Sequence, residues 1–538
     1  MDMRETLTRN VSWIVVARAG YMVSRVLVPP FVVARIGLQS YGLWSALFVF
    51  ISYIGFSALG VSSAYVKYVA EYVARGEIRK ANSLLSTGIV ATTIIGLVVF
   101  LISLYASPWI LSWLNVPPSA SHDAYWLLNF VVALFVINLS LSVFSDSLAG
   151  SQKIAETQLV SVSGYVLETT LIFLLVGAGY GIKGLAIAFA IRLATGILLS
   201  AYLAFKLQPW LRLSIRRCSR EALKTLLGFG GIVQLSFLLS IALNSVERAI
   251  AAPLIGLSAV GLLDLSDKLP SNAGSVSEAF SYCFMPAASY LQGKEVGERG
   301  RLDSVLTLYL RGSRYMSLAA ASMLGLLAAA SAPIATVWVG KLYPGMGFLL
   351  AIFTIQQQFH IMTGPGTSIL KGVGRPVEEF FYILPNIVFL ILAIPASRLI
   401  AGHWSAIGLG TAVVATTMLS SITFLTRAHY RLAVPWNRYL KYVALPAVVP
   451  YLVAALCAWP VWLLMPGMGR LSGAALLFGM GLVYLVALIV AVDRLVFDSD
   501  ERAMMRSVVR REARRLFSAF SFSTGGRLGQ PVASEIRP

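Results

Sequence analysis

Long apolar stretches separated by short polar connections are the dominant pattern along the chain. Each stretch runs for about 20 residues, the length that an α-helix needs to cross roughly 30 Å of hydrocarbon. On this criterion the sequence predicts an all-α, polytopic membrane protein with about fourteen transmembrane helices. The stretches begin near Val11, Tyr41, Leu84, Ala124, Gln158, Gly184, Gly228, Ala259, Tyr315, Met346, Phe380, Trp404, Tyr442 and Leu471.

Several of the predicted helices contain residues that interrupt helical hydrogen bonding. The first holds Pro29-Pro30, the eighth holds Pro270, and the tenth holds Gly364-Pro365-Gly366. A break inside a membrane is tolerated where the freed backbone groups face protein or water instead of lipid. We therefore expect these points to face protein or water.

The composition excludes a water-soluble fold. Hydrophobic residues make up 57% of the 538 residues and charged residues 12%, with a mean hydropathy of +0.77, whereas a soluble domain carries about a quarter charged residues. Cys218, Cys283 and Cys457 have neither metal-site nor redox spacing, so no metal centre or disulfide framework is expected. The polar N-terminus lacks a small-residue cleavage site, so no cleaved signal peptide is expected.

The formal net charge of +19 is distributed as a topology signal. In a soluble protein it would suggest nucleic-acid binding, but here the positive residues lie mostly between helices, so no nucleic acid is expected as a partner. Even-numbered connections hold most of them, and odd-numbered connections hold only Arg35, Lys183, Lys341, Arg398 and Arg470. The positive-inside rule predicts a multi-pass protein of the cell inner (cytoplasmic) membrane with both termini cytoplasmic.

Three short segments of the first half of the chain recur in order in the second half, at offsets of 219, 222 and 224 residues. The pairs are Ile36-Gly37-Leu38 plus Gly42-Leu43 with Ile255-Gly256-Leu257 plus Gly261-Leu262; Leu148, Gly150, Lys153 and Glu156 with Leu370, Gly372, Arg375 and Glu378; and Gly184-Leu185 with Gly408-Leu409. The period covers six predicted helices, an even number, so the repeat is parallel.

This repeat predicts the domain organisation. Residues 1–210 form an N-terminal lobe of six helices, 211–430 a C-terminal lobe of six, 431–495 two appended helices, and 496–538 a basic cytoplasmic tail. Transporters built in this way carry substrate between the lobes. A duplication kept for scaffold reasons alone is the alternative.

The segment Ala34-Arg35-Ile36-Gly37-Leu38-Gln39-Ser40-Tyr41-Gly42-Leu43-Trp44 resembles the first loop and second helix of the polysaccharide transporter family, the Wzx-type lipid-linked oligosaccharide flippases of the multidrug/oligosaccharidyl-lipid/polysaccharide flippase superfamily. Ala64-Tyr65-Val66-Lys67-Tyr68, Ala81-Asn82 and Ala149-Gly150-Ser151-Gln152-Lys153 fit the same pattern. The resemblance implies a fourteen-helix fold and an oligosaccharide substrate on an isoprenoid pyrophosphate. Ser57-Ala58-Leu59-Gly60 departs from it where members often have an acidic residue.

Five cations fall within predicted helices of both repeats: Arg18, Arg25, Arg192, Arg248 and Lys268. Charges at this depth normally face a cavity and mark a transport path, and guanidinium groups bind phosphate oxygens bidentately. We expect these residues to contact an anionic substrate. The alternative is that each pairs with a nearby acid, as Lys268 could with Asp264 or Asp267 and Arg248 with Glu247.

Six carboxylates lie at similar depths: Asp146, Glu168, Glu247, Asp264, Asp267 and Glu278. A carboxylate in this position carries a proton, ligates Na⁺ or pairs with a cation. Glu168 and Asp264 are slightly favoured for ion coupling. Gln356, Gln357 and His360 form a further polar group, for which a buried, hydrogen-bonded histidine is favoured over a proton relay.

These features together predict a flippase, not an enzyme. The phosphate loop, nucleophile elbow and paired metal ligands of common enzymes are absent from the sequence, so no cofactor is expected. Around residues 498–520 arginines alternate with apolar residues, which indicates a helix on membrane lipids; contact with a polysaccharide polymerase or glycosyltransferase is the other hypothesis. A multidrug or cation extrusion antiporter and a non-transporting assembly subunit are the alternative functions.

Overall fold

The computed structural model describes residues 3–54, 61–228, 246–278, 280–281, 284–293, 298–401, 403–499 and 501–503. Within these ranges the chain is built from helices joined by turns, without a β-strand. The predicted all-α class is confirmed. Three features discussed above lie outside the described residues: the departure at Ser57–Gly60, the first part of the predicted seventh helix, and the tail beyond residue 503.

The helices of the first half match most of the predicted stretches. They are α1 (Met3–Ile54), α2 (Val61–Ala74), α3 (Ile78–Trp113), α4 (Pro118–Leu141), α5 (Val143–Gly150), α6 (Ile154–Gly177), α7 (Gly181–Leu207) and the short 3₁₀ helix η2 (Ile215–Arg217).

The described helices of the second half vary in length from 4 to 32 residues. They are α9 (Val246–Leu254), α10 (Leu257–Glu278), α11 (Phe284–Gly293), α12 (Glu298–Ala329), α13 (Ser331–Val339), α14 (Met346–Gly372), the 3₁₀ helix η4 (Pro376–Glu379), α15 (Phe380–Ala401), α16 (Ala406–Leu432), α17 (Trp436–Tyr439), the π-helix η5 (Leu440–Ala444), α18 (Leu445–Leu464), α19 (Arg470–Ala491) and the π-helix η6 (Val492–Val496).

The described residues contain nine helices long and apolar enough to cross a membrane, or ten if α12 and α13, bent by 76°, form one span. Helix α1 covers two of the predicted spans and is broken at Gly37, whose backbone is not helical (φ 80°, ψ 164°). The chain is therefore a multi-pass membrane protein. The count of fourteen stays a prediction, and so do the domain boundaries at residues 210, 430 and 495.

Local sequence explains where several helices start and stop. Ser405 precedes α16, and its hydroxyl accepts a hydrogen bond from the Gly408 N–H at 3.0 Å, as an N-cap does. Pro118 opens α4, where its missing N–H leaves no helical bond unmade. Gly340 ends α13 in the left-handed conformation (φ 81°) that favours glycine.

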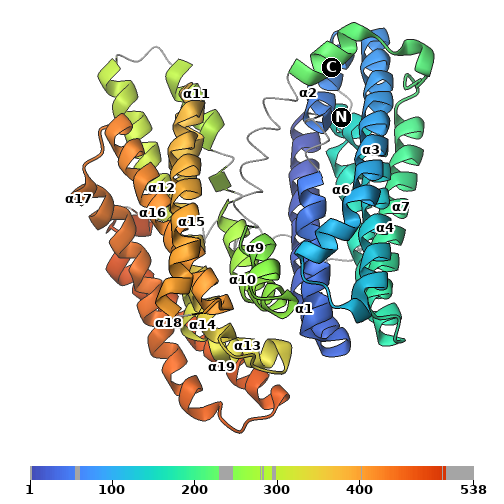
Figure 1. Cartoon of the computed structure of the whole chain (residues 1–538). Coiled ribbons are helices and arrows are strands. Elements are labelled where there is room, and N and C mark those ends of the chain that lie inside the picture. The colour runs from blue at the N-terminus through green and yellow to red at the C-terminus, as the bar shows by residue number, and fades with distance from the viewer. Residues whose placement is uncertain are drawn as a thin grey trace, which may run out of the picture.

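The helices form two groups that meet at one end of the molecule, the lower end in Figure 1. Helices α1 to α7 make up one group, and α11 to α19 lie in the other. Helices α9 and α10 lie between them and pack against α1, and α13 also contacts α1. The connection before α4 also contacts α9, because Asn115 Nδ2 donates a hydrogen bond to the Pro253 carbonyl oxygen over 2.9 Å.

Two glycines at equivalent positions of the repeat allow α1 and α10 to approach each other closely. A methyl group on Gly261 of α10 would lie 2.6 Å from the Leu38 carbonyl oxygen, and one on Gly42 of α1 would overlap the carbonyl oxygen of Leu257. The contact is reciprocal, since Leu38 and Gly42 correspond to Leu257 and Gly261 in the repeat. Only glycine allows the two backbones to approach so closely.

The break at Pro29-Pro30 is satisfied by the opposite group of helices. Proline at position 30 has no N–H, so the Val26 carbonyl lacks its usual helical donor. The Trp338 Nε1–H of α13 donates to that carbonyl over 2.7 Å. The expectation that such breaks face protein or water is confirmed at this position.

Candidate functional site

A cavity of about 300 Å³ lies where α1, α6 and α7 face α9 and α10. We call it the basic cavity, because Arg25, Arg248 and Lys268 line it against two carboxylates, Glu168 and Asp264. Aromatic and apolar side chains complete its wall: Tyr21, Val28, Pro29, Val32, Tyr41, Trp44, Phe48, Val49, Ile172, Leu185 and Phe189.

Asp264 of α10 is the most connected charge of the cavity. Its carboxylate lies 2.8 Å from Arg248 Nη1 and 3.1 Å from Lys268 Nζ, and it accepts a hydrogen bond from the Tyr41 hydroxyl of α1. The Asp264 side chain is 3% exposed, whereas those of Arg248 and Lys268 are 18% and 24% exposed. Three donors thus offset the unfavourable burial of this carboxylate.

Arg25 differs from the other cavity cations. Within the part of the chain that the structure describes it makes no ion pair, and its guanidinium group lies 5.0 Å from the centre of the Tyr21 ring. Arg18 lies 5.9 Å from the centre of the same ring but is exposed and does not line the cavity. The Tyr21 ring therefore lies close to both guanidinium groups, an arrangement that cation–π attraction favours.

Arg192 of α7 pairs with Glu168 of α6, with 3.2 Å between Nε and Oε2. Glu168 faces the basic cavity, while Arg192 lines a smaller cavity of about 180 Å³ among α4 to α7. This smaller cavity is rich in hydroxyl groups from Ser142, Ser145, Thr157, Ser161 and Ser200.

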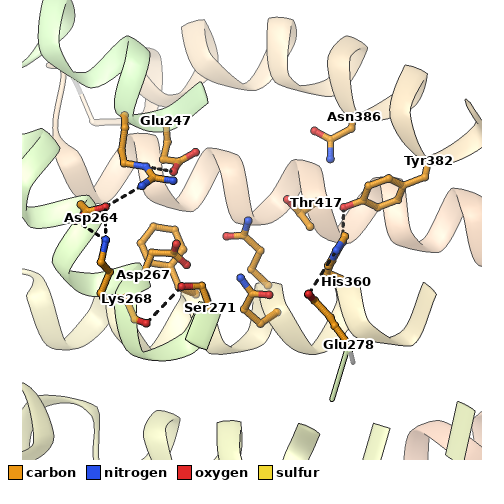
Figure 2. A pocket seen from close by; sticks show the side chains of 14 residues that line it. Glu247, Asp264, Asp267, Lys268, Ser271, Glu278, His360, Tyr382, Asn386 and Thr417 are labelled. Atoms are coloured by element: carbon orange, nitrogen blue, oxygen red, sulfur yellow. Dashed lines mark hydrogen bonds and ion pairs between the residues drawn. The ribbon is translucent and has the colours of Figure 1, made fainter. Parts of the chain in front are cut away.

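A second cavity of about 290 Å³ shares Arg248, Asp264 and Lys268 with the first; Figure 2 shows it from close by. We call it the acidic cavity, because Glu247, Asp267 and Glu278 bring its carboxylates to four against two permanent cations. The single ion cluster thus separates a cavity with excess positive charge from one with excess negative charge.

The far end of the acidic cavity holds a polar group on α10, α14 and α15. His360 Nδ1 lies 3.0 Å from the Tyr382 hydroxyl, and Nε2 lies 3.8 Å from Glu278 Oε1 (Figure 2). The Gln356 carbonyl oxygen is buried there without a hydrogen-bond partner. His360 is half-buried, and its contact with Tyr382 fits the prediction of a hydrogen-bonded histidine.

Comparison with known proteins gives this arrangement a context. The MatE family model matches residues 21–174. The uncharacterized membrane protein EpsK of Bacillus subtilis (strain 168) is 22% identical over 444 residues, which cover 80% of this chain and 84% of EpsK. The lipid II flippase MurJ in an inward closed conformation superposes with a TM-score of 0.66 at 14% identity, covering 91% of this chain and 99% of MurJ.

An inward-facing multidrug resistance MATE family transporter of the MOP superfamily superposes with a TM-score of 0.64 at 18% identity, over 77% of this chain and 94% of that one. The chain has the MOP-superfamily transporter fold. This is the fold that the resemblance of the quoted motifs implied. Of these two solved proteins, one is a lipid II flippase and the other a multidrug transporter.

Within this MOP-type fold the predicted substrate-binding residues separate into two groups. Arg25, Arg248 and Lys268 line the basic cavity, and Arg192 and Arg18 do not; contact of any of them with substrate stays a prediction. The alternative of pairing with acids also holds for three cations: Lys268 with Asp264, Arg248 with Glu247 and Asp264, and Arg192 with Glu168.

The two predicted ion-coupling residues, Glu168 and Asp264, both lie in ion pairs at the basic cavity. Whether either couples transport to an ion stays a prediction. Sequence reasoning missed Tyr41 and Tyr21, whose hydroxyl and ring complete the site. The available signal was position: Tyr41 lies next to the repeated Gly42, and Tyr21 lies between Arg18 and Arg25.

Proposed function

We propose that the protein is a flippase that moves a lipid-linked oligosaccharide, carried on an isoprenoid pyrophosphate, across the cytoplasmic membrane for cell-surface polysaccharide biosynthesis. The observation that carries the proposal is the basic cavity between the two groups of helices, with Arg25 free of ion pairs within the described residues. A guanidinium group without a carboxylate partner is available to bind phosphate oxygens in a bidentate manner.

The aromatic residues of the same cavity fit the sugar part of such a substrate. Tyr21, Trp44 and Phe48 line the cavity together with Arg25 and Arg248, so apolar ring faces and cations face one space. A pyrophosphate-linked sugar presents the complementary sequence of charge and apolar ring face. The isoprenoid tail stays in the bilayer while the headgroup passes between the lobes by alternating access.

Orientation follows from the positive-inside prediction. The contact between Gly42 and Gly261 lies near the odd-numbered connections, so we place it on the outer side and both termini in the cytoplasm. The substrate then enters from the cytoplasmic side. A glycan polymerase or glycosyltransferase at the basic tail belongs to the same proposal as a partner.

Multidrug or cation extrusion is the second candidate function, and the acidic cavity favours it. Four carboxylates line that space, and an organic cation would bind there in place of a sodium ion or proton. The two functions make opposite demands, because an anionic substrate requires Arg25 and a cationic one requires Glu247 or Asp267.

The proposal is tested in cells depleted of the protein. Lipids are extracted, and the sidedness of the lipid-linked glycan is probed with a membrane-impermeant reagent. Accumulation on the cytoplasmic face together with less surface polysaccharide is the expected result. Unchanged sidedness in cells without a redundant flippase contradicts flipping and makes drug efflux the next assay.

Replacing Arg25 with alanine is expected to reduce substrate affinity roughly 10- to 100-fold, since a hydrogen bond to a charged group contributes about 1.5–3 kcal/mol. Surface polysaccharide is measured at equal protein abundance. Arg35→Ala is the matched control, because Arg35 is exposed on the same helix and does not line the cavity. Arg18→Ala is expected to have a smaller effect than Arg25→Ala; wild-type polysaccharide in both Arg18→Ala and Arg25→Ala cells rules out their substrate role.

A further inference from the structure

The contact between α1 and α10 leaves almost no freedom for small adjustments. We call it the outer seam, formed by Leu38 and Gly42 on α1 and by Leu257 and Gly261 on α10. Because a methyl group would not fit at either glycine, the backbones touch without side chains between them. Contacts of this kind are either closed or separated, since packed interfaces are bistable and do not deform continuously.

Asp264 connects this seam to the basic cavity. It lies three residues after Gly261 and so shares a face of α10 with it, and it accepts a hydrogen bond from Tyr41, the residue before Gly42. The same carboxylate pairs with Arg248 and Lys268, which line the cavity. The Asp264 side chain therefore accepts the hydrogen bond that spans the seam and also pairs with two of the cations that line the cavity.

We propose that Asp264 is the positioning residue that transmits occupation of the basic cavity to the outer seam. The inference rests on the proposed function, because it takes an isoprenoid pyrophosphate as the anion that enters the cavity. In the empty protein, Arg248 and Lys268 neutralise Asp264 and leave its carboxylate beside Tyr41, with the seam closed.

A pyrophosphate in the cavity competes with Asp264 for the same two cations. The carboxylate is 3% exposed, and a buried carboxylate that loses its cations is strongly disfavoured and is repelled by the phosphate charge. Separation of α1 from α10 at the seam gives Asp264 access to water and removes that penalty. Substrate binding therefore favours the open seam, and by linkage an open seam binds substrate more tightly.

The test uses the full-length protein in nanodiscs, with the native cysteines replaced by serine and spin labels on Ser119→Cys and Lys341→Cys. Both positions are exposed: Ser119 lies in the first turn of α4, and Lys341 lies in the connection between α13 and α14, in the opposite group of helices. The distance between the two spin labels is measured with farnesyl pyrophosphate as the probe and with farnesol as its uncharged control. The affinity for the probe is measured separately by calorimetry. We expect farnesyl pyrophosphate, and not farnesol, to lengthen the distance.

Two variants test the role of Asp264 separately from the closure of the seam and from binding in the cavity. Tyr41→Phe removes the hydrogen bond across the seam and is expected to raise the open-to-closed ratio roughly 10-fold without probe. Asp264→Asn keeps an acceptor for Tyr41 but loses the charge, so the probe is expected to bind while the distance no longer responds. Glu247→Gln is the matched control, since Glu247 also pairs with Arg248 but has no hydrogen bond to Tyr41; its distance still responds.

Each failure has a distinct meaning. If farnesyl pyrophosphate does not bind the unsubstituted protein, the proposed function fails. If it binds and the distance is unchanged, or if Asp264→Asn responds like the parent protein, Asp264 does not transmit occupation and the proposed function stands.

Folding of each variant is checked by gel filtration. Tyr382→Phe, which removes a tyrosine hydroxyl in the acidic cavity, is expected to leave the distances unchanged.

Discussion

At the scale of single residues, one proline and one tryptophan act as a pair across the molecule. Pro30 leaves the Val26 carbonyl without its helical donor, and Trp338 supplies the missing N–H from the other group of helices. A buried acceptor left without a partner destabilises a protein by about 1–3 kcal/mol. Pro30 therefore leaves a carbonyl acceptor that Trp338 binds.

This pairing predicts a non-additive pair of substitutions. Trp338→Phe is expected to lower the free energy of unfolding by about 1–3 kcal/mol, because it leaves the Val26 carbonyl unpaired. In a Pro30→Ala background the loss should be smaller, since the alanine N–H is able to take that carbonyl. The apparent melting temperature in detergent is the measurement. Equal losses in both backgrounds would mean that Trp338 acts through packing alone.

At the scale of elements, the break inside α1 depends on a backbone shape that glycine alone adopts readily. Gly37 has φ 80° and ψ 164°, a region where a side chain is strained by about 1–3 kcal/mol. Its repeat counterpart Gly256 also has positive φ, at 119°. Both breaks come shortly before the glycine that enters the seam, so the two helices turn toward each other by the same device.

Gly37→Ala is expected to lower the melting temperature even though no atom lies within 4 Å of the added methyl group. The penalty arises from the backbone alone. Gly20→Ala is the control: Gly20 also has open space around its Cβ position but lies in regular helix, where alanine is as stable as glycine or more so. If both variants melt alike, backbone strain at Gly37 is excluded.

At the scale of the whole molecule, features that depend on local sequence were predicted better than contacts between helices. Helix length and proline position predicted the all-α class and the freed carbonyl at the Pro29-Pro30 break, because each depends on neighbouring residues. The Arg192–Glu168 pair was not predicted, since it depends on how α6 and α7 rotate against each other. Lipid and the protein interior are equally apolar. The sequence of a membrane helix therefore says little about which of its faces packs against protein and which faces lipid.

Alternating access makes a prediction at this scale. A thiol cross-link between Asn115→Cys and Pro253→Cys, whose native groups lie 2.9 Å apart across the two groups of helices, should hold them together and stop flipping. The native cysteines are replaced first, and a short bifunctional reagent and then a reductant are applied. Surface polysaccharide should fall and then recover. Transport that continues after complete cross-linking contradicts opening at this position.

The seam also has a consequence for synthesis of the chain. Tyr41 and Asp264 are separated by 223 residues, and ribosomes add about 5–20 residues per second. Helix α1 therefore waits on the order of 10 to 45 s in the membrane before its partner exists. During that interval the bare glycine surface and the Val26 carbonyl have no protein cover from the second half, so lipid, water or an insertion factor must shield them until α10 and α13 arrive.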